Sequence, residues 1–183
     1  MKKKRSSLIL GFASLLTLVP SLLHAQAVYT ATRGSRMQAG AGVVLISPDY
    51  VNKDIEGVSG WFDYDFNRFL GVEASVHLGS IITPNDVTED SYMVGPRFLY
   101  HKRKFTANVK FLYGHATLSF QGPYPPPITY GFSAYAFGGG LEYRIARKWN
   151  IRCIDVELQQ WPDFVPNTLA PMAITIGASY IIH

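Results

Sequence analysis

Six charged side chains fall at alternate positions of segments in which large apolar residues alternate with small ones. They are Glu73, Arg97, Lys110, Glu142, Asp155 and Glu157. Carboxylates and cations brought together in this way can form a buried ion-pair network, line a narrow pore or proton path, or supply a catalytic carboxylate. Which of these chemistries is possible depends on the structure of the segments that carry these residues.

Two pairs of serine and histidine suggest a different chemistry, because hydrolysis and acyl transfer need a serine beside a base. Ser75 and His77 share one face at a spacing of two, and His115 and Ser119 share a face near a predicted loop. No complete set of nucleophile, base and oxyanion donors accompanies either pair, and no cluster of metal ligands is present. We therefore expect no catalytic residue, no metal site and no cofactor.

Strict period-two alternation predicts that the charged segments are β-strands. The clearest case is Phe132–Gln160, where two alternating arms are joined by a tight turn near Ala146–Trp149. One face of each arm is large and apolar, and the other is small or charged. The same pattern predicts further strands at Met37–Leu45, Val58–Phe66, Leu70–Gly79, Tyr92–Tyr100, Phe105–Gly114 and Ile174–Ile182. This gives eight strands of about nine to eleven residues, the length that crosses a bilayer at a tilt.

The connections between these strands alternate regularly in length. Long polar connections follow the first, third, fifth and seventh strands, and they include Ser47–Gly57, Ser80–Asp90, Gln121–Tyr130 and Trp161–Pro171. Tight turns follow the second, fourth and sixth strands, at Asn67–Arg68, His101–Lys104 and Ala146–Trp149. Long loops at one end and short turns at the other are typical of a transmembrane barrel.

We therefore predict an all-β fold, an eight-stranded antiparallel up-and-down transmembrane β-barrel with its bulky faces toward lipid. The interior of a barrel this small is filled by side chains, so charges inside it must be paired. The expected ion pairs are Glu73 with Arg97 and Lys110 with Glu142, with Asp155 and Glu157 nearby. The favoured interpretation is a structural plug, and the alternative is a gated pore or proton path.

The N-terminus predicts export. Lys2–Arg5 is basic, Leu8–Leu23 is mainly apolar, and Ala25–Ala27 is a small-residue cleavage site. This pattern predicts a signal peptide at residues 1–27, followed by the barrel domain at residues 28–183. Cleavage after Ala25 or after Ala27 fits equally. The chain has 17 Lys and Arg against 13 Asp and Glu, so loss of the four basic residues leaves a formal charge of zero and no indication of nucleic-acid binding. The single cysteine, Cys153, cannot form an internal disulfide and is expected on the inward face.

The strand-turn-strand blocks Tyr64–Glu73 and Gly138–Arg144, together with the last strand, resemble the small OmpA/OmpX-type outer-membrane β-barrel superfamily. The resemblance spans Met37 to Ile182. It implies a monomer in the cell outer membrane whose partners are outer-membrane lipid, lipopolysaccharide and the barrel-assembly machinery. That machinery usually recognises a terminal aromatic residue, and Ile182 stands in its place here.

The most favoured function is a structural or surface-interaction role with a plugged lumen. A narrow pore or transport channel is the first alternative, and a lipid A-modifying enzyme is the second. A soluble lipocalin-like barrel is a further alternative, and it would point the bulky face inward toward a ligand cavity.

Overall fold

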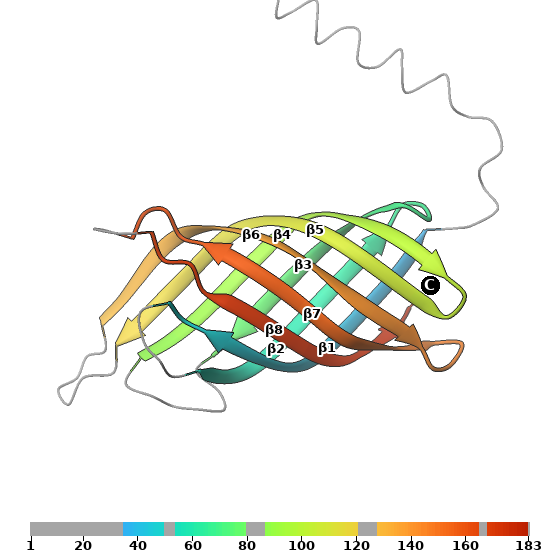
Figure 1. Cartoon of the computed structure of the whole chain (residues 1–183), viewed down its shortest axis with the longest axis horizontal. Helices are drawn as coiled ribbons and strands as arrows, with labels where there is room; N and C mark the ends of the chain where they lie inside the picture. The colour runs from blue at the N-terminus through green and yellow to red at the C-terminus, as the bar shows by residue number, and fades with distance from the viewer. Residues whose placement is uncertain (1–34, 50–53, 80–86, 121–127, 165–167, 183) are drawn as a thin grey trace, which may run out of the picture. The chain divides into compact units, whose positions relative to one another are not determined.

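The computed structural model describes residues 35–49, 54–79, 87–120, 128–164 and 168–182, which form a closed antiparallel β-barrel (Figure 1). Each strand pairs with the next along the chain, and the last pairs with the first. The strands are β1 (Arg36–Ser47), β2 (Ile55–Asp65), β3 (Leu70–Leu78), β4 (Val87–Lys102), β5 (Phe105–Phe120), β6 (Ile128–Arg144), β7 (Trp149–Gln160) and β8 (Met172–Ile181). The predicted fold class is confirmed.

Closure depends on the ladder between the first and last strands. Val43 of β1 faces Ile176 of β8 on one side and Val58 of β2 on the other. Because this ladder closes the barrel, the backbone N–H and C=O groups of the strands form hydrogen bonds within it. A β-sheet can cross lipid only under this condition. Within the described ranges, no helix is long and apolar enough to cross a bilayer.

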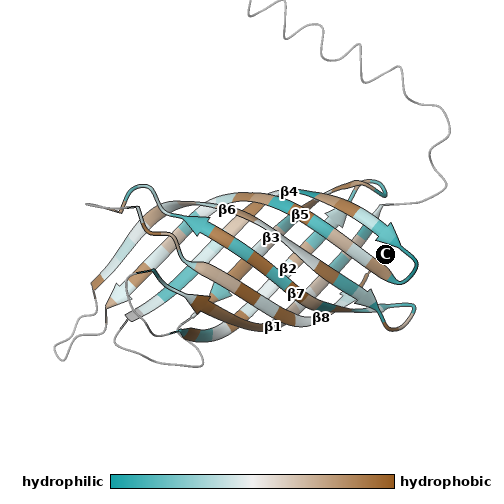
Figure 2. Cartoon of the chain, in the orientation of Figure 1, coloured by the Kyte–Doolittle hydropathy of each residue, from teal (hydrophilic) through white to brown (hydrophobic). Residues whose placement is uncertain are grey.

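The two faces of the wall divide as the alternation predicts. Large outward side chains are exposed, for example Phe98 at 58% and Phe137 at 59%, whereas the inward Glu73 and Arg97 are fully buried. Figure 2 shows hydrophobic and hydrophilic residues alternating along the strands. A lipocalin-like barrel requires the opposite arrangement, so that alternative is wrong.

Three short turns join the strands at one end, here called the turn end. Two of them are centred on residues 66–69 and 145–148, and the third is the two-residue turn Arg103–Lys104. Arg103 has a φ of 58° and is the non-glycine residue with positive φ in the described chain. The opposite, or loop, end carries the long connections, as predicted.

Strand length departs from the prediction on one side of the barrel. β4, β5 and β6 have 16, 16 and 17 residues, against 9 to 12 in the other strands. The extra residues lie at the loop end, where the sequence predicted loop up to Asp90 and from Gln121 to Tyr130. Polar residues at these strand ends resemble loop composition, so the extension was not predicted.

A β-bulge in β7 changes the phase of that strand. Leu141 faces Ile154 and the next residue, Glu142, faces Arg152, so the extra residue on β7 is Cys153. Arg152 and Asp155 consequently both point inward and are buried, although they lie three residues apart. Cys153 is half-buried at the bulge itself and not simply an inward residue.

Glycines allow close packing where large groups enter the lumen. A Cβ on Gly177 or Gly40 would collide with the indole of Trp61, which is buried inside the barrel. A Cβ on Gly140 would lie 2.6 Å from the carboxylate of Asp155. Glycine at these positions therefore allows a neighbouring group to approach the backbone closely.

Some predictions concern residues outside the described part of the chain. The signal peptide at residues 1–27 is one, and residues 121–127 of the predicted connection Gln121–Tyr130 are another.

Candidate functional site in the barrel lumen

The structure brings the six charged residues predicted from sequence into one cluster inside the barrel, nearer the turn end. Glu73 of β3 is its centre. Its carboxylate lies 3.3 Å from Arg97 Nη1 of β4 and 2.6 Å from Lys110 Nζ of β5. The expected pair of Glu73 and Arg97 is therefore present.

The other expected pair, Lys110 with Glu142, is not formed. Lys110 Nζ instead lies 2.5 Å from Asp155 Oδ2 and 2.7 Å from Glu157 Oε1, both on β7, in addition to Glu73. Glu142 pairs with Arg97 at 3.3 Å. Strands in a barrel are staggered, so alternation gives the face of each residue but not its neighbour around the circumference.

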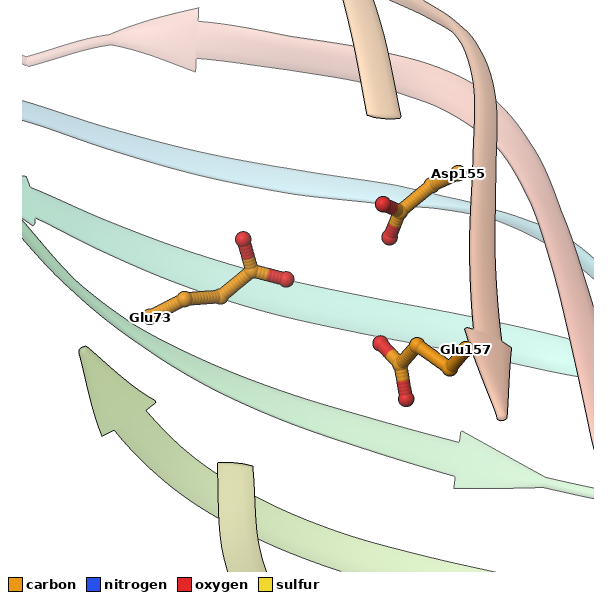
Figure 3. A group of neighbouring side chains, drawn as sticks. All are labelled: Glu73, Asp155 and Glu157. Carbon is orange, nitrogen blue, oxygen red and sulfur yellow. The ribbon is translucent and has the colours of Figure 1, made fainter. Parts of the chain in front are cut away.

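Three carboxylates converge on the ammonium group of Lys110. Figure 3 shows Glu73 pointing from β3 toward Asp155 and Glu157 of β7. One oxygen from each lies within 4.8 Å of the others, a spacing that suits a metal ion. The Nζ of Lys110 is already at hydrogen-bond distance from all three. In this chain a lysine thus supplies the positive charge that the carboxylates require.

Arg152 completes the cluster and was missed by the sequence analysis. Its Nη1 and Nη2 lie 3.0 and 3.1 Å from the two oxygens of Glu73, which is a bidentate pair. It also reaches Asp155 at 3.0 Å and Glu142 at 3.4 Å, and its guanidinium lies 4.1 Å from the Trp61 ring. Strict alternation places Arg152 on the lipid-facing surface of β7, and it points inward only because of the bulge.

Two aspartates of β2 were also missed, although the alternation of that strand already placed them inward. Asp63 accepts a hydrogen bond from Gln38 Nε2 at 2.6 Å and forms an ion pair with Arg97. Asp65 lies 3.6 Å from Arg97 Nε. Gln38 in turn donates to Glu142 at 3.0 Å. The charges thus form one network that spans strands β1 to β7.

We call this network the charged layer, and it contains more carboxylates than cations. Its members are Asp63, Asp65, Glu73, Glu142, Asp155 and Glu157 with Arg97, Lys110 and Arg152. All nine are buried. Charges taken out of water are costly unless paired and hydrogen-bonded, so each cation here serves several carboxylates at once.

The loop-end half of the lumen is filled differently. A second group, the apolar layer, consists of Met93, Leu112, Ala116, Leu118, Ala134, Ala136, Trp161 and Leu169, each at most 4% exposed. Phe132 and Phe164 pack against it. The Trp161 ring stacks on Phe132 at 6.0 Å, and Trp161 pairs with Leu169 across the seventh connection. Trp161 and Leu169 of this connection therefore pack inside the loop end of the barrel.

A row of polar side chains links the two layers. His77 Nδ1 lies 3.4 Å from Ser91 Oγ, and its Nε2 lies 3.8 Å from Glu157 Oε1. Gln159 Nε2 lies 3.5 Å from Ser91 Oγ and its carbonyl accepts from Trp161 Nε1 at 3.1 Å. His77 therefore contacts Ser91 rather than the predicted Ser75.

The row and its glutamate partner contain the residue types of a catalytic triad, namely serine, histidine and glutamate. Their surroundings, however, differ from those of an active site. Ser91, His77 and Glu157 are each at most 4% exposed. The Ser91–His77 hydrogen bond is 3.4 Å long and the His77–Glu157 ion pair is 3.8 Å long, so neither is the short contact that a catalytic triad needs. The second predicted pair is on the outside, where His115 is exposed and Ser119 Oγ bonds to Thr129 Oγ1 at 2.9 Å.

Comparison with known proteins places this arrangement in a family. The family described as "Outer membrane protein beta-barrel domain" matches residues 12–181. A search of curated proteins gives no match.

Solved structures with the same fold cover about four fifths of the chain. Ail of Yersinia pestis, solved with the heparin analogue sucrose octasulfate, is 19% identical with a TM-score of 0.53, over 81% of this chain and 97% of that one. Neisserial surface protein A is 11% identical with a TM-score of 0.57, over 81% and 97%. OprG of Pseudomonas aeruginosa is 11% identical with a TM-score of 0.56, over 82% and 97%.

These similarities confirm the predicted resemblance to small outer-membrane barrels. The family match covers most of the chain, and the strand count, the closure and the lipid-facing aromatic residues agree with it. The chain belongs to the outer membrane protein beta-barrel domain family.

Proposed function

We propose that this protein is a closed outer-membrane scaffold that presents a surface-interaction site at its loop end. The observation that carries the proposal is the extension of β4, β5 and β6. About eleven tilted residues cross a bilayer, so the five or six residues of each of these strands nearest the loop end extend beyond it. Family barrels place their long loops outside the cell, so the extension faces the exterior.

The projecting sheet carries apolar side chains that lipid does not cover. Ile128 is 58% exposed, Tyr130 is 50% exposed and Phe120 is 39% exposed. The rings of Phe120 and Tyr130 are 6.2 Å apart in an edge-to-face arrangement. Exposed apolar groups outside the hydrocarbon region mark a site for another protein or surface.

The charge of the loop end favours one class of partner. Among the described residues, the exposed charged groups at this end are carboxylates, namely Asp49, Asp54, Glu56 and Asp163. A polysulfated ligand such as the heparin analogue in the Ail structure would be repelled. A protein with apolar and basic groups fits better. By the same reasoning, contact with lipopolysaccharide phosphates would need bridging divalent cations.

Cell attachment tests the proposal. Cells that display the barrel should attach to immobilised extracellular-matrix proteins better than cells with an empty vector, and heparin-coated wells should show no gain. The variant I128S/Y130S should lose most of this attachment, while V109S, which changes an outward residue in mid-membrane, should keep it once surface display is matched. Equal attachment by displaying and empty cells would refute the proposal.

The narrow-pore alternative rests on the surplus of carboxylates in the charged layer, which would select cations. Both layers fill the lumen, so conduction would require both to move. We expect planar bilayers with the purified barrel to show no discrete current steps. Cation-selective steps would favour the pore, and altered lipid A masses in expressing cells would favour the enzyme.

A further inference from the structure

The exposed charges at the two ends of the barrel have opposite signs. At the turn end, the exposed ionised groups in the described chain are all cations. They are Arg68, Lys102, Arg103, Lys104, Arg144, Arg147 and Lys148. We call this set the turn rim. The loop end, in contrast, carries exposed carboxylates such as Asp54 and Asp163.

Each of the three short turns repeats one arrangement, a cation beside an aromatic ring. Arg68 lies 4.3 Å from the Phe69 ring centroid in the first turn. Near the second turn, Lys104 Nζ lies 6.0 Å from the ring of Tyr143. The third turn places Lys148 Nζ at 5.7 Å from the ring of Tyr180.

These rings belong to the outward, lipid-facing surface. Tyr143 packs on Phe105 at 4.9 Å and Tyr180 packs on Trp149 at 5.3 Å. Phe105 is 46% exposed and Trp149 is 50% exposed. Aromatic residues at the ends of transmembrane strands lie at the depth of the lipid headgroups. Each ring therefore holds its cation at the level where headgroup phosphates lie.

We propose that the turn rim binds the phosphodiester headgroups of anionic glycerophospholipids in the periplasmic leaflet, with one such site at each turn. The lysines and arginines supply charge and hydrogen-bond donors, and the rings hold them against the membrane surface. Lipopolysaccharide occupies the leaflet at the other end, so the phospholipid is the anionic lipid within reach of these groups.

Tryptophan fluorescence offers a direct test, because the three tryptophans of the chain differ in exposure. Trp149 contacts lipid beside Lys148, whereas Trp61 and Trp161 are buried at 4% and 1% exposure. Phospholipids brominated on their acyl chains therefore quench chiefly Trp149. In mixed bilayers, brominated phosphatidylglycerol should quench more than brominated phosphatidylcholine, with a relative binding constant near Trp149 about fivefold higher for each cation engaged.

The following variants distinguish an effect of charge on lipid binding from an effect on barrel folding. R147Q/K148Q should reduce the preference for phosphatidylglycerol to near one, and K148R should keep it. D54N/D163N at the loop end is the matched control and should leave it unchanged. The heat-dependent gel shift of each variant shows that the barrel has formed, and added salt should weaken the preference. Equal quenching by the two lipids, or an unchanged preference in R147Q/K148Q, would overturn the proposal. So would binding to isolated peptidoglycan that depends on these residues while the lipid preference does not.

Discussion

The charged layer and the apolar layer fill the same narrow lumen by opposite means. In the charged layer, Arg152 alone contacts Glu73, Asp63, Glu142 and Asp155, so each cation holds carboxylates from several strands. In the apolar layer, Leu112 and its neighbours are held mainly by apolar packing, although Trp161 Nε1 also donates to Gln159. Ion pairs require one arrangement of strands, whereas apolar packing tolerates small shifts.

This difference suggests a division of roles between the two halves of the lumen. The charged layer fixes the register of six strands, β2 to β7, near the turn end. The apolar layer fills the loop-end half of the lumen, where apolar packing tolerates small shifts of its members. The following changes test this division, and they are ordered from the largest expected effect to the smallest.

Arg152→Met should have the largest effect on the free energy of unfolding. It keeps an unbranched apolar stem but removes the one cation that contacts all four of these buried carboxylates, which leaves them to Arg97 and Lys110. We expect a loss of about 5 kcal/mol, at the upper end of the range for breaking buried ion pairs. Urea unfolding in liposomes, followed by tryptophan fluorescence, measures this loss.

The control for Arg152→Met is Arg147→Met, an exposed arginine in a turn, which should change stability by less than about 0.5 kcal/mol. Adding Glu73→Gln to Arg152→Met should cost less than the sum of the single losses, because the two residues share a bidentate pair. Similar losses for Arg147→Met and Arg152→Met would show that the charged layer has no special role.

Lys110→Met should destabilise the barrel by about 3 kcal/mol, because it removes the ammonium group from three carboxylates. Their oxygens lie within 4.8 Å of one another, so a divalent cation can take the place of the lysine. We expect millimolar Ca²⁺ to raise the urea midpoint of the variant but not that of the wild type. Asp155→Asn in the same variant should abolish this recovery. A variant that does not respond to Ca²⁺ would mean that the carboxylates rearrange once the lysine is lost.

The sequence predicts the wall of the barrel better than its interior. Alternation is a local property, and it correctly assigns Glu73, Arg97 and Lys110 to the inward face. Asp63 and Asp65 lie on the same phase of β2, so their charges could have been included. Arg152 could not, because a bulge of one residue reverses the phase and no local pattern around Cys153 marks it.

Neighbours across the lumen are harder to predict than faces. They depend on the stagger between strands, and this is why Lys110 pairs with β7 and not with Glu142. The apolar layer was not predicted for a related reason. Leu112 follows the period-two alternation of β5, but Trp161 and Leu169 lie in a connection that has no period-two pattern to indicate that they are buried.

Leu112→Ala tests the contribution of the apolar layer to stability. Leu112 is fully buried, so its truncation should cost about 2–3 kcal/mol through lost burial and an unfilled cavity. Leu112→Met should be almost neutral because it conserves volume. Val109→Ala is the lipid-facing control, since Val109 is 49% exposed. If Leu112→Ala costs as much as Arg152→Met, the two layers contribute equally and the proposed division fails.

Ser91→Ala should have the smallest effect, because it tests the boundary where the layers meet. The hydroxyl of Ser91 lies 3.4 Å from His77 and 3.5 Å from Gln159, at the long limit for hydrogen bonds. Its removal should therefore cost less than about 1 kcal/mol. Gln159→Leu should cost more, since Trp161 Nε1 then loses its acceptor. If Ser91→Ala instead proves as damaging as Leu112→Ala, the polar row is part of the charged layer, and the lumen is one cooperative network from Gln38 to Trp161.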